Sequence, residues 1–147
     1  MAMIDLARDL HRFLSQDPLT IADIATRVGP ITSDPGVPME IQLSPVIPGV
    51  SAARLARYPD SGLPFTLTLE PTPDARPTAA ALRGTFGEGR RGLTDRGRPP
   101  ELQFDPPAAG PRWHVVVIAE LDGLGGAAGI DAARAIRIVF RRDPVSP

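Results

Sequence analysis

Residues 113–121, WHVVVIAEL, decide the fold class of this chain. Successive side chains of a β-strand point to opposite faces, so this segment divides into two sets. The first set is apolar throughout: Trp113, Val115, Val117, Ala119 and Leu121. The second set is half aliphatic: His114, Val116, Ile118 and Glu120. We therefore expect a central strand, which is either covered on both faces or has one face that awaits a partner.

Weaker alternation predicts further strands on both sides of this segment. They are expected at 39–44, 52–58, 65–69, 101–106 and 136–142. Turns rich in Pro and Gly separate them, and the glycine-rich residues 123–128 predict a long hairpin connection between the last two strands. Short strands joined by such turns favour an antiparallel sheet.

Three segments predict helices. Residues 3–16 have an amphipathic helical pattern. Thr20 is expected to cap a second helix, with Asp23 completing a capping box and Gly29 ending the helix in a left-handed conformation. Thr78 is expected to cap a third, short helix that ends at Gly87.

The same order of elements, a helix followed by three strands, occurs twice in the sequence. We expect one α+β domain over residues 1–147, with an antiparallel sheet of five or six strands and the helices on one face. It begins with the helix at 3–16, continues with two divergent repeats at 19–70 and 77–142, and ends with a tail at 143–147. The alternative is a chance similarity between two α+β segments.

Composition excludes several classes of protein. The 147 residues weigh 15.6 kDa, carry a net charge of −1 and include no Cys. This charge argues against general binding to nucleic acids or acidic membranes. All 16 cationic residues are Arg and there is no Asn, which indicates a GC-rich, bacterial genome. The early acids and the lack of a long apolar run argue against a signal peptide or membrane span, so we expect a cytoplasmic protein.

Two motifs match by letters but not by context. Residues 19–29 resemble the first helix and turn of a helix-turn-helix domain, yet three prolines at 30–38 prevent a recognition helix from following. Residues 87–92 and 123–128 resemble dinucleotide-binding glycine motifs. A helix precedes the first, and only a short chain follows the second, so neither predicts a nucleotide site.

The segment 83–98 is rich in arginine and glycine. Its cations are Arg83, Arg90, Arg91, Arg96 and Arg98. Such a loop can hold phosphates or carboxylates bidentately, which leaves a ligand- or nucleic-acid-binding module as the alternative function. A solvated loop explains the same composition.

Catalysis and cofactor binding have little support in the sequence. His11 and His114 are the only histidines, and no cysteine is present. Glu120 shares a strand face with His114 but lies six residues away, roughly 20 Å along a strand. No group of residues has metal-ligand spacing. We expect neither an enzyme nor a metal or cofactor site.

The repeated unit of a capping Thr, a short helix, a Gly and then strands resembles known helix–sheet modules. Leu19, Thr20 and Gly29, and then Pro77, Thr78 and Gly87, carry the likeness. It is similar to the modules of the BamE outer-membrane lipoproteins and of the β-lactamase inhibitory proteins. That resemblance implies an antiparallel sheet whose exposed face holds another protein. Those families are exported, whereas we expect no export signal in this sequence.

Together these observations predict a non-catalytic protein-binding module. We expect the role of an immunity or inhibitor protein that occludes a partner protein, for instance a toxin encoded nearby. We do not expect a membrane or a nucleic acid as the partner. Aromatic and Arg side chains dominate binding hot spots, so the predicted binding residues are Tyr58, Arg90, Arg91, Arg96 and Trp113. Trp113 as a plain core residue is an equal alternative, and a homodimer is left open.

Overall fold

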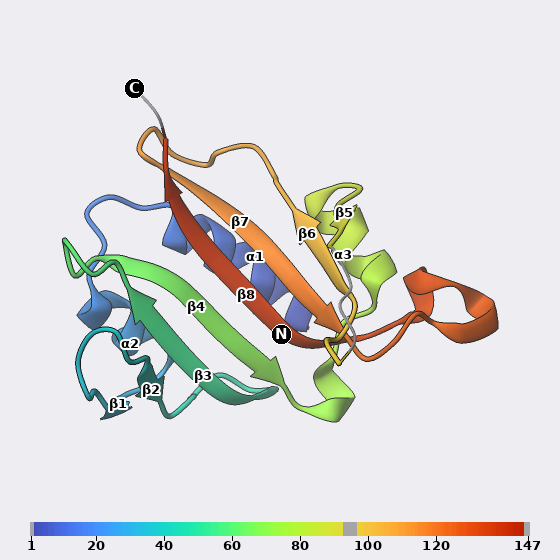
Figure 1. The fold of residues 1–147 in the computed structure, drawn as a ribbon, viewed down its shortest axis with the longest axis horizontal. Coiled ribbons are helices and arrows are strands. Elements are labelled where there is room, and N and C mark those ends of the chain that lie inside the picture. The colour runs from blue at the N-terminus through green and yellow to red at the C-terminus, as the bar shows by residue number, and fades with distance from the viewer. Residues whose placement is uncertain (1, 93–96, 146–147) are drawn as a thin grey trace.

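The computed structural model describes residues 2–92 and 97–145, over which the chain forms three α-helices and one antiparallel sheet of eight strands (Figure 1). The helices are α1 (Met3–Leu14), α2 (Ile21–Val28) and α3 (Ala79–Phe86). The strands are β1 (Ile31–Ser33), β2 (Ile41–Leu43), β3 (Val50–Arg57), β4 (Pro64–Pro71), β5 (Arg90–Arg91), β6 (Glu101–Phe104), β7 (Trp113–Leu121) and β8 (Ala135–Pro144).

The predicted α+β class and antiparallel sheet are confirmed, but the prediction of five or six strands is wrong. The two unpredicted strands are β1 and β5, which form the two edges of the sheet. They contain three and two residues, all exposed, so they have no alternation of buried and exposed positions from which a strand could be predicted.

The strand order is β1-β2-β3-β4-β8-β7-β6-β5, so two four-stranded meanders meet where β4 pairs with β8. At this seam Leu67 lies opposite Phe140, and Leu69 lies opposite Ile138. In both meanders a helix precedes four strands, whereas the sequence predicted three strands after each helix. That the two halves are divergent repeats of one unit remains a prediction.

The helices pack on one side of the sheet, behind it in Figure 1. Helix α2 begins with the predicted capping box between Thr20 and Asp23, and the Thr78 side chain caps α3 by accepting from the Ala81 amide. One face of each helix is buried in the shared core, through Ile24 and Val28 of α2 and through Leu82 and Phe86 of α3. Helix α1 ends at Leu14, two residues before the predicted end.

Gly29 ends α2 as predicted, but not in the left-handed helical conformation. Its φ of 157° and ψ of 159° place it in an extended region that is open to glycine alone. The residues after β2 fold back onto this point, because the Ser44 amide donates to Pro30 and the Val46 amide donates to Val28. A side chain at position 29 would collide with the Ser44 carbonyl.

Strand β7 is central, as its sequence predicts, between β8 and β6. Val115, Val117 and Ala119 point to the helices and are fully buried. The opposite side of β7 is covered by no helix in the described parts of the chain. Of the two alternatives for this strand, the structure therefore has the one in which a face of the sheet is left open.

Candidate functional site: the open face of the sheet

We call the side of the sheet away from the helices the open face, and it is the side toward the viewer in Figure 1. Because side chains alternate along each strand, the open face is formed by every second residue of the four long strands. These residues are Ala52, Arg54 and Ala56 of β3, Thr66, Thr68 and Glu70 of β4, Arg137, Val139, Arg141 and Asp143 of β8, and His114, Val116, Ile118 and Glu120 of β7.

A short apolar strip crosses the middle of the open face. Thr68, Val139 and Ile118 lie side by side on β4, β8 and β7. Val116 beside them is only 3% exposed, although no helix of the described chain covers it. Arg141 lies opposite Val116 on β8. Thr68 is 6% exposed, so the accessible apolar surface of this strip comes from the half-buried Val139 and Ile118.

Arg137 forms a polar frame at one end of the strip. Its guanidinium donates to Glu70 on β4 at 3.1 Å and also to Glu120 on β7. Burial disfavours the charge, but the two carboxylates outweigh burial and raise the pKa of Arg137 above its usual value. The three side chains thus hold one another across the central three strands of the sheet.

A small hollow of about 210 Å³ lies beside Arg137 on the open face. Arg98, Glu101 and Glu120 line it together with Arg137. Its volume suits a single side chain, and its mixed charges suit a polar one. It places charged groups of both signs at the rim of the apolar strip.

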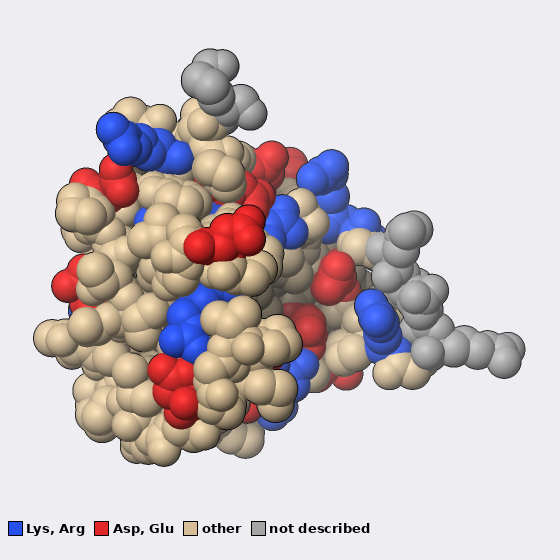
Figure 2. Space-filling model, turned by 60° about the vertical axis from the view of Figure 1, so that its left-hand side comes forward, with Lys and Arg blue, Asp and Glu red and all other residues tan. Residues whose placement is uncertain are grey.

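Further ion pairs continue the frame along the open face. Arg141 donates to Asp143 on the same strand at 3.0 Å, and Arg54 lies 3.1 Å from Glu40. Figure 2 shows Arg and acidic residues interspersed rather than gathered into a field of one sign. The charges on the side seen in this view are therefore mixed in sign.

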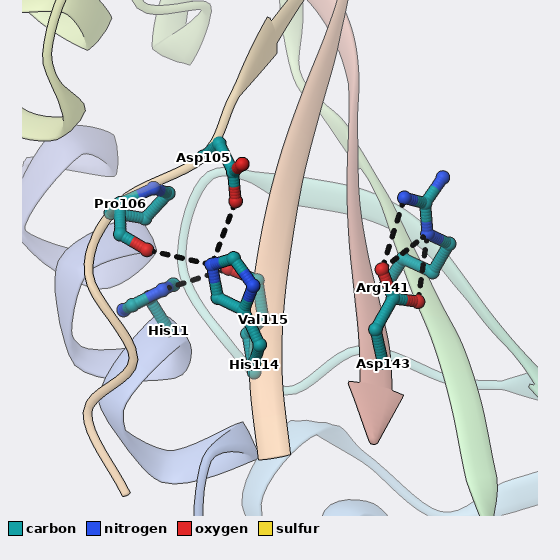
Figure 3. Close-up of polar contacts among 7 residues, drawn as sticks. All are labelled: His11, Asp105, Pro106, His114, Val115, Arg141 and Asp143. Carbon is teal, nitrogen blue, oxygen red and sulfur yellow. Dashed lines mark hydrogen bonds and ion pairs between the residues drawn. The ribbon is translucent and has the colours of Figure 1, made fainter. Parts of the chain in front are cut away.

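Each of the two histidines contacts other groups of the protein (Figure 3). His114 Nε2 lies 2.7 Å from an Asp105 carboxylate oxygen and 2.8 Å from the Pro106 carbonyl. His11 Nε2 donates to the Val115 carbonyl at 3.0 Å. The contacts of His114 and of His11 lie just beyond Phe104, the last residue of β6. The His11 ring therefore donates to a β7 carbonyl at a point where β6 no longer pairs with β7. Glu120 is engaged by Arg137 and takes no part.

Protonation of His11 is expected to make stability depend on pH. Burial lowers the pKa of His11, and His114 lowers it further, although the hydrogen bond to Val115 opposes this. The unfolded chain therefore binds a proton near pH 6.5, whereas the folded chain binds one only at lower pH. The free energy of unfolding should be at its full value above that pH and fall as the pH drops below it.

Urea unfolding between about pH 8 and about pH 5.5 measures this dependence. His11→Gln keeps a side-chain N–H but cannot ionise, so its stability should decline less on acidification than that of the wild type. His114→Gln keeps the ionisable His11 but removes one cause of its lowered pKa, so its stability should still decline on acidification, by less than in the wild type. An equal decline in His11→Gln and the wild type would contradict the prediction.

The predicted binding residues occupy two separate places. Tyr58 and Trp113 come together at one end of the sheet, with ring centroids 6.1 Å apart, and the Trp113 ring stacks on the guanidinium of Arg142 at 4.1 Å. Arg90 and Arg91 are exposed on the edge strand β5. Arg90 lies opposite Gln103 of β6, which lies opposite Ile118 of β7, so the two arginines are far along the sheet from Trp113. Arg96 lies outside the described residues.

The arginines of residues 83–98 do not converge where the structure describes them. Arg83 is held by Asp131 and by the Glu88 carbonyl, while Arg98 lines the hollow beside Arg137. Among the described residues, no group of three or more His, Cys, Asp or Glu side chains is placed to hold a metal ion. Nor is any helix in those parts of the chain long and apolar enough to cross a membrane.

Sequence reasoning missed the Glu70–Arg137–Glu120 cluster and the buried Arg142. The guanidinium of Arg142 donates to the carbonyls of Leu14, Gln16 and Pro64, and the side chain is almost fully buried. One sequence pattern could have found it, because position 142 continues the inward alternation of Ile138 and Phe140.

Comparisons of the chain with known protein families, with curated proteins and with solved structures find no match.

Proposed function

We propose that this protein is a non-catalytic binding module that covers a partner protein with the open face of its sheet. The observation that carries the proposal is an eight-stranded sheet with helices on one side, whose other side holds an apolar strip within a frame of ion pairs. Antiparallel sheets tolerate water on one face. Here that face is arranged as binding surfaces are, apolar at the centre and charged around it.

The size of the open face suits such a role. Four strands of about eight residues, spaced about 4.8 Å apart, present roughly 500 Å². The shorter outer strands extend this area toward the ~800 Å² that each partner buries in a standard interface. Ion pairs that are already formed lose little side-chain entropy on binding, so a rigid face of this kind favours occlusion of a preformed surface.

In its concrete form the proposal is an immunity or inhibitor protein that neutralises a toxin by covering it. Glu120, which shares a strand face with His114, is engaged by Arg137, and this supports contact rather than chemistry for that pair. The competing nucleic-acid function draws no support from Arg83, whose guanidinium is held within the protein.

Capture from the native lysate identifies the partner, and binding of the purified partner to paired variants tests the surface. Ala52→Arg with Ile118→Gln adds bulk and polarity to the open face. Ala52 lies opposite Glu70, which can accept the new guanidinium without loss of the sheet. Ala22→Arg with Leu124→Gln is the matched control, with an Ala→Arg change and an aliphatic→Gln change at exposed positions away from the open face.

The open-face variant should raise the Kd about 100-fold or more, as loss of a hot spot does, and the control should leave it unchanged. Protection from hydrogen exchange should appear on β4, β8 and β7. Equal effects of the two variants, or protection confined to the helices, would overturn the proposal. Capture of nucleic acid that salt releases would favour the alternative function.

A further inference from the structure

Two adjoining depressions lie at the end of the sheet, around the carboxyl end of α1. Their volumes are about 550 Å³ and about 450 Å³, and both are lined by Asp17, Pro111 and Arg112. We call them together the end groove. The larger half is completed by Arg12, Ser15, Gln16, Ala109 and Gly110. The smaller half is completed by Leu63, Trp113, Pro144 and Val145.

The smaller half is an apolar pocket with rigid walls. Trp113 rests on the guanidinium of Arg142, which is itself held by three carbonyls, so the indole has little freedom to move. Two prolines stand beside it. Leu63 and Val145 are 38% and 41% exposed and turn apolar surface toward solvent at this site. Immobile aromatic and proline walls lower the entropy lost on binding.

The larger half has an excess of positive charge. Arg12 is exposed and belongs to no ion pair among the described residues. Arg112 lies 3.4 Å from Asp17, yet its side chain is 75% exposed, so its guanidinium can donate to a second carboxylate. Two guanidinium groups thus face a single acid across the groove. The complementary ligand carries a carboxylate for this half and an apolar side chain for the other.

We propose that the end groove binds a short extended peptide segment of a partner protein, with a proline or branched aliphatic residue in the Trp113 pocket and an acidic residue against Arg12 and Arg112. Residues of an extended chain advance about 3.3 Å each, so two or three residues bridge neighbouring pockets of this size. The end groove lies at the end of the sheet, whereas the proposed function uses its open face. The two proposals therefore stand or fall separately.

Trp113 is the only tryptophan of the chain, so its fluorescence reports on the groove directly. The probes are three blocked peptides. Acetyl-Glu-Pro-Leu-Pro-Glu-amide carries both features in either chain direction, a second peptide has Lys in place of both Glu residues, and a third has Gly-Ser-Gly in place of Pro-Leu-Pro. The acidic apolar peptide should saturate with a Kd of about 0.1–1 mM, and the other two should bind at least about 10-fold more weakly.

Variants test whether the fluorescence change arises from peptide bound in the end groove. Arg112→Gln should raise the Kd of the acidic peptide about 5-fold to 10-fold and reduce its advantage over the Lys peptide. Leu63→Ser should weaken both peptides that contain Pro-Leu-Pro. Arg8→Gln, an exposed arginine outside the groove, is the control and should change nothing. The proposal is overturned if the fluorescence does not change up to about 10 mM peptide, or if the acidic and basic peptides bind equally well. An equal response to inorganic phosphate, or a fluorescence change that follows protein concentration alone, would also overturn it.

Discussion

Arg142→Leu is expected to lower the free energy of unfolding by about 3 kcal/mol or more. The guanidinium donates to Leu14 at 2.8 Å, to Pro64 at 3.0 Å and to Gln16 at 3.2 Å. The Leu14 and Pro64 carbonyls are buried and each costs about 1 kcal/mol or more when it loses its donor, whereas the part-buried Gln16 carbonyl adds less. The substitution also removes the cation under the Trp113 ring.

The position of Arg142 explains why a charged side chain is stable there. Burial lowers the pKa of Arg142, but a guanidinium remains protonated in proteins. Two of its acceptors are at or beyond the last residue of α1, where a helix has unpaired carbonyls and a negative partial charge. The third begins β4. Arg142 therefore links the end of α1 to the sheet, and its loss should loosen that link.

Arg141→Leu is the matched control for this prediction. The neighbouring arginine points to the open face and pairs with Asp143 in a half-exposed contact, which is worth less than about 1 kcal/mol. Urea unfolding measured by far-ultraviolet circular dichroism should separate the two variants clearly. Similar losses in both would show that Arg142 is not the link inferred here. Near-ultraviolet circular dichroism should also report altered packing of Trp113 in Arg142→Leu alone.

Gly29→Ala is expected to have the second largest effect, a loss of about 3 kcal/mol. A β-carbon at position 29 would lie 1.8 Å from the Ser44 carbonyl oxygen, so the backbone itself must move. Residues 44–46 are tied to the end of α2 by two backbone hydrogen bonds of 2.9 and 2.8 Å, and they cannot yield without breaking them. Strain at this φ adds about 1–3 kcal/mol to the cost of the collision.

Gly87→Ala separates the collision from the strain. Gly87 ends α3 in the same way, with its amide bonded to Arg83, and it too has a positive φ. No atom lies within 4 Å of the β-carbon that alanine would add, among the described residues. Gly87→Ala should therefore cost only about 1–2 kcal/mol. Thermal unfolding of both variants tests the difference, and equal losses would refute the role assigned to Ser44.

Several features of the candidate site follow from local sequence, and others do not. The alternation in residues 113–121 predicted a central strand that is either covered on both faces or has one face that awaits a partner, and the structure leaves one face without a helix, while a partner for it remains a prediction. Aromatic and Arg content suggested Tyr58 and Trp113 as binding residues, and both lie at the end of the sheet beside Arg142. Their role in binding remains a prediction. The Glu70–Arg137–Glu120 cluster had no local pattern, because Arg137 lies 67 and 17 residues from its partners.

The sequence alone determined the elements that depend on neighbours along the chain. Caps at Thr20 and Thr78, amphipathic helix faces and strand alternation act over a few residues, so they can be recognised before any fold is known. Only the tertiary structure decided the order of the eight strands, the side left open and the burial of Arg142 rather than Arg141. These depend on contacts between segments far apart in the sequence, whose free energy is realised only once helices and sheet have packed together.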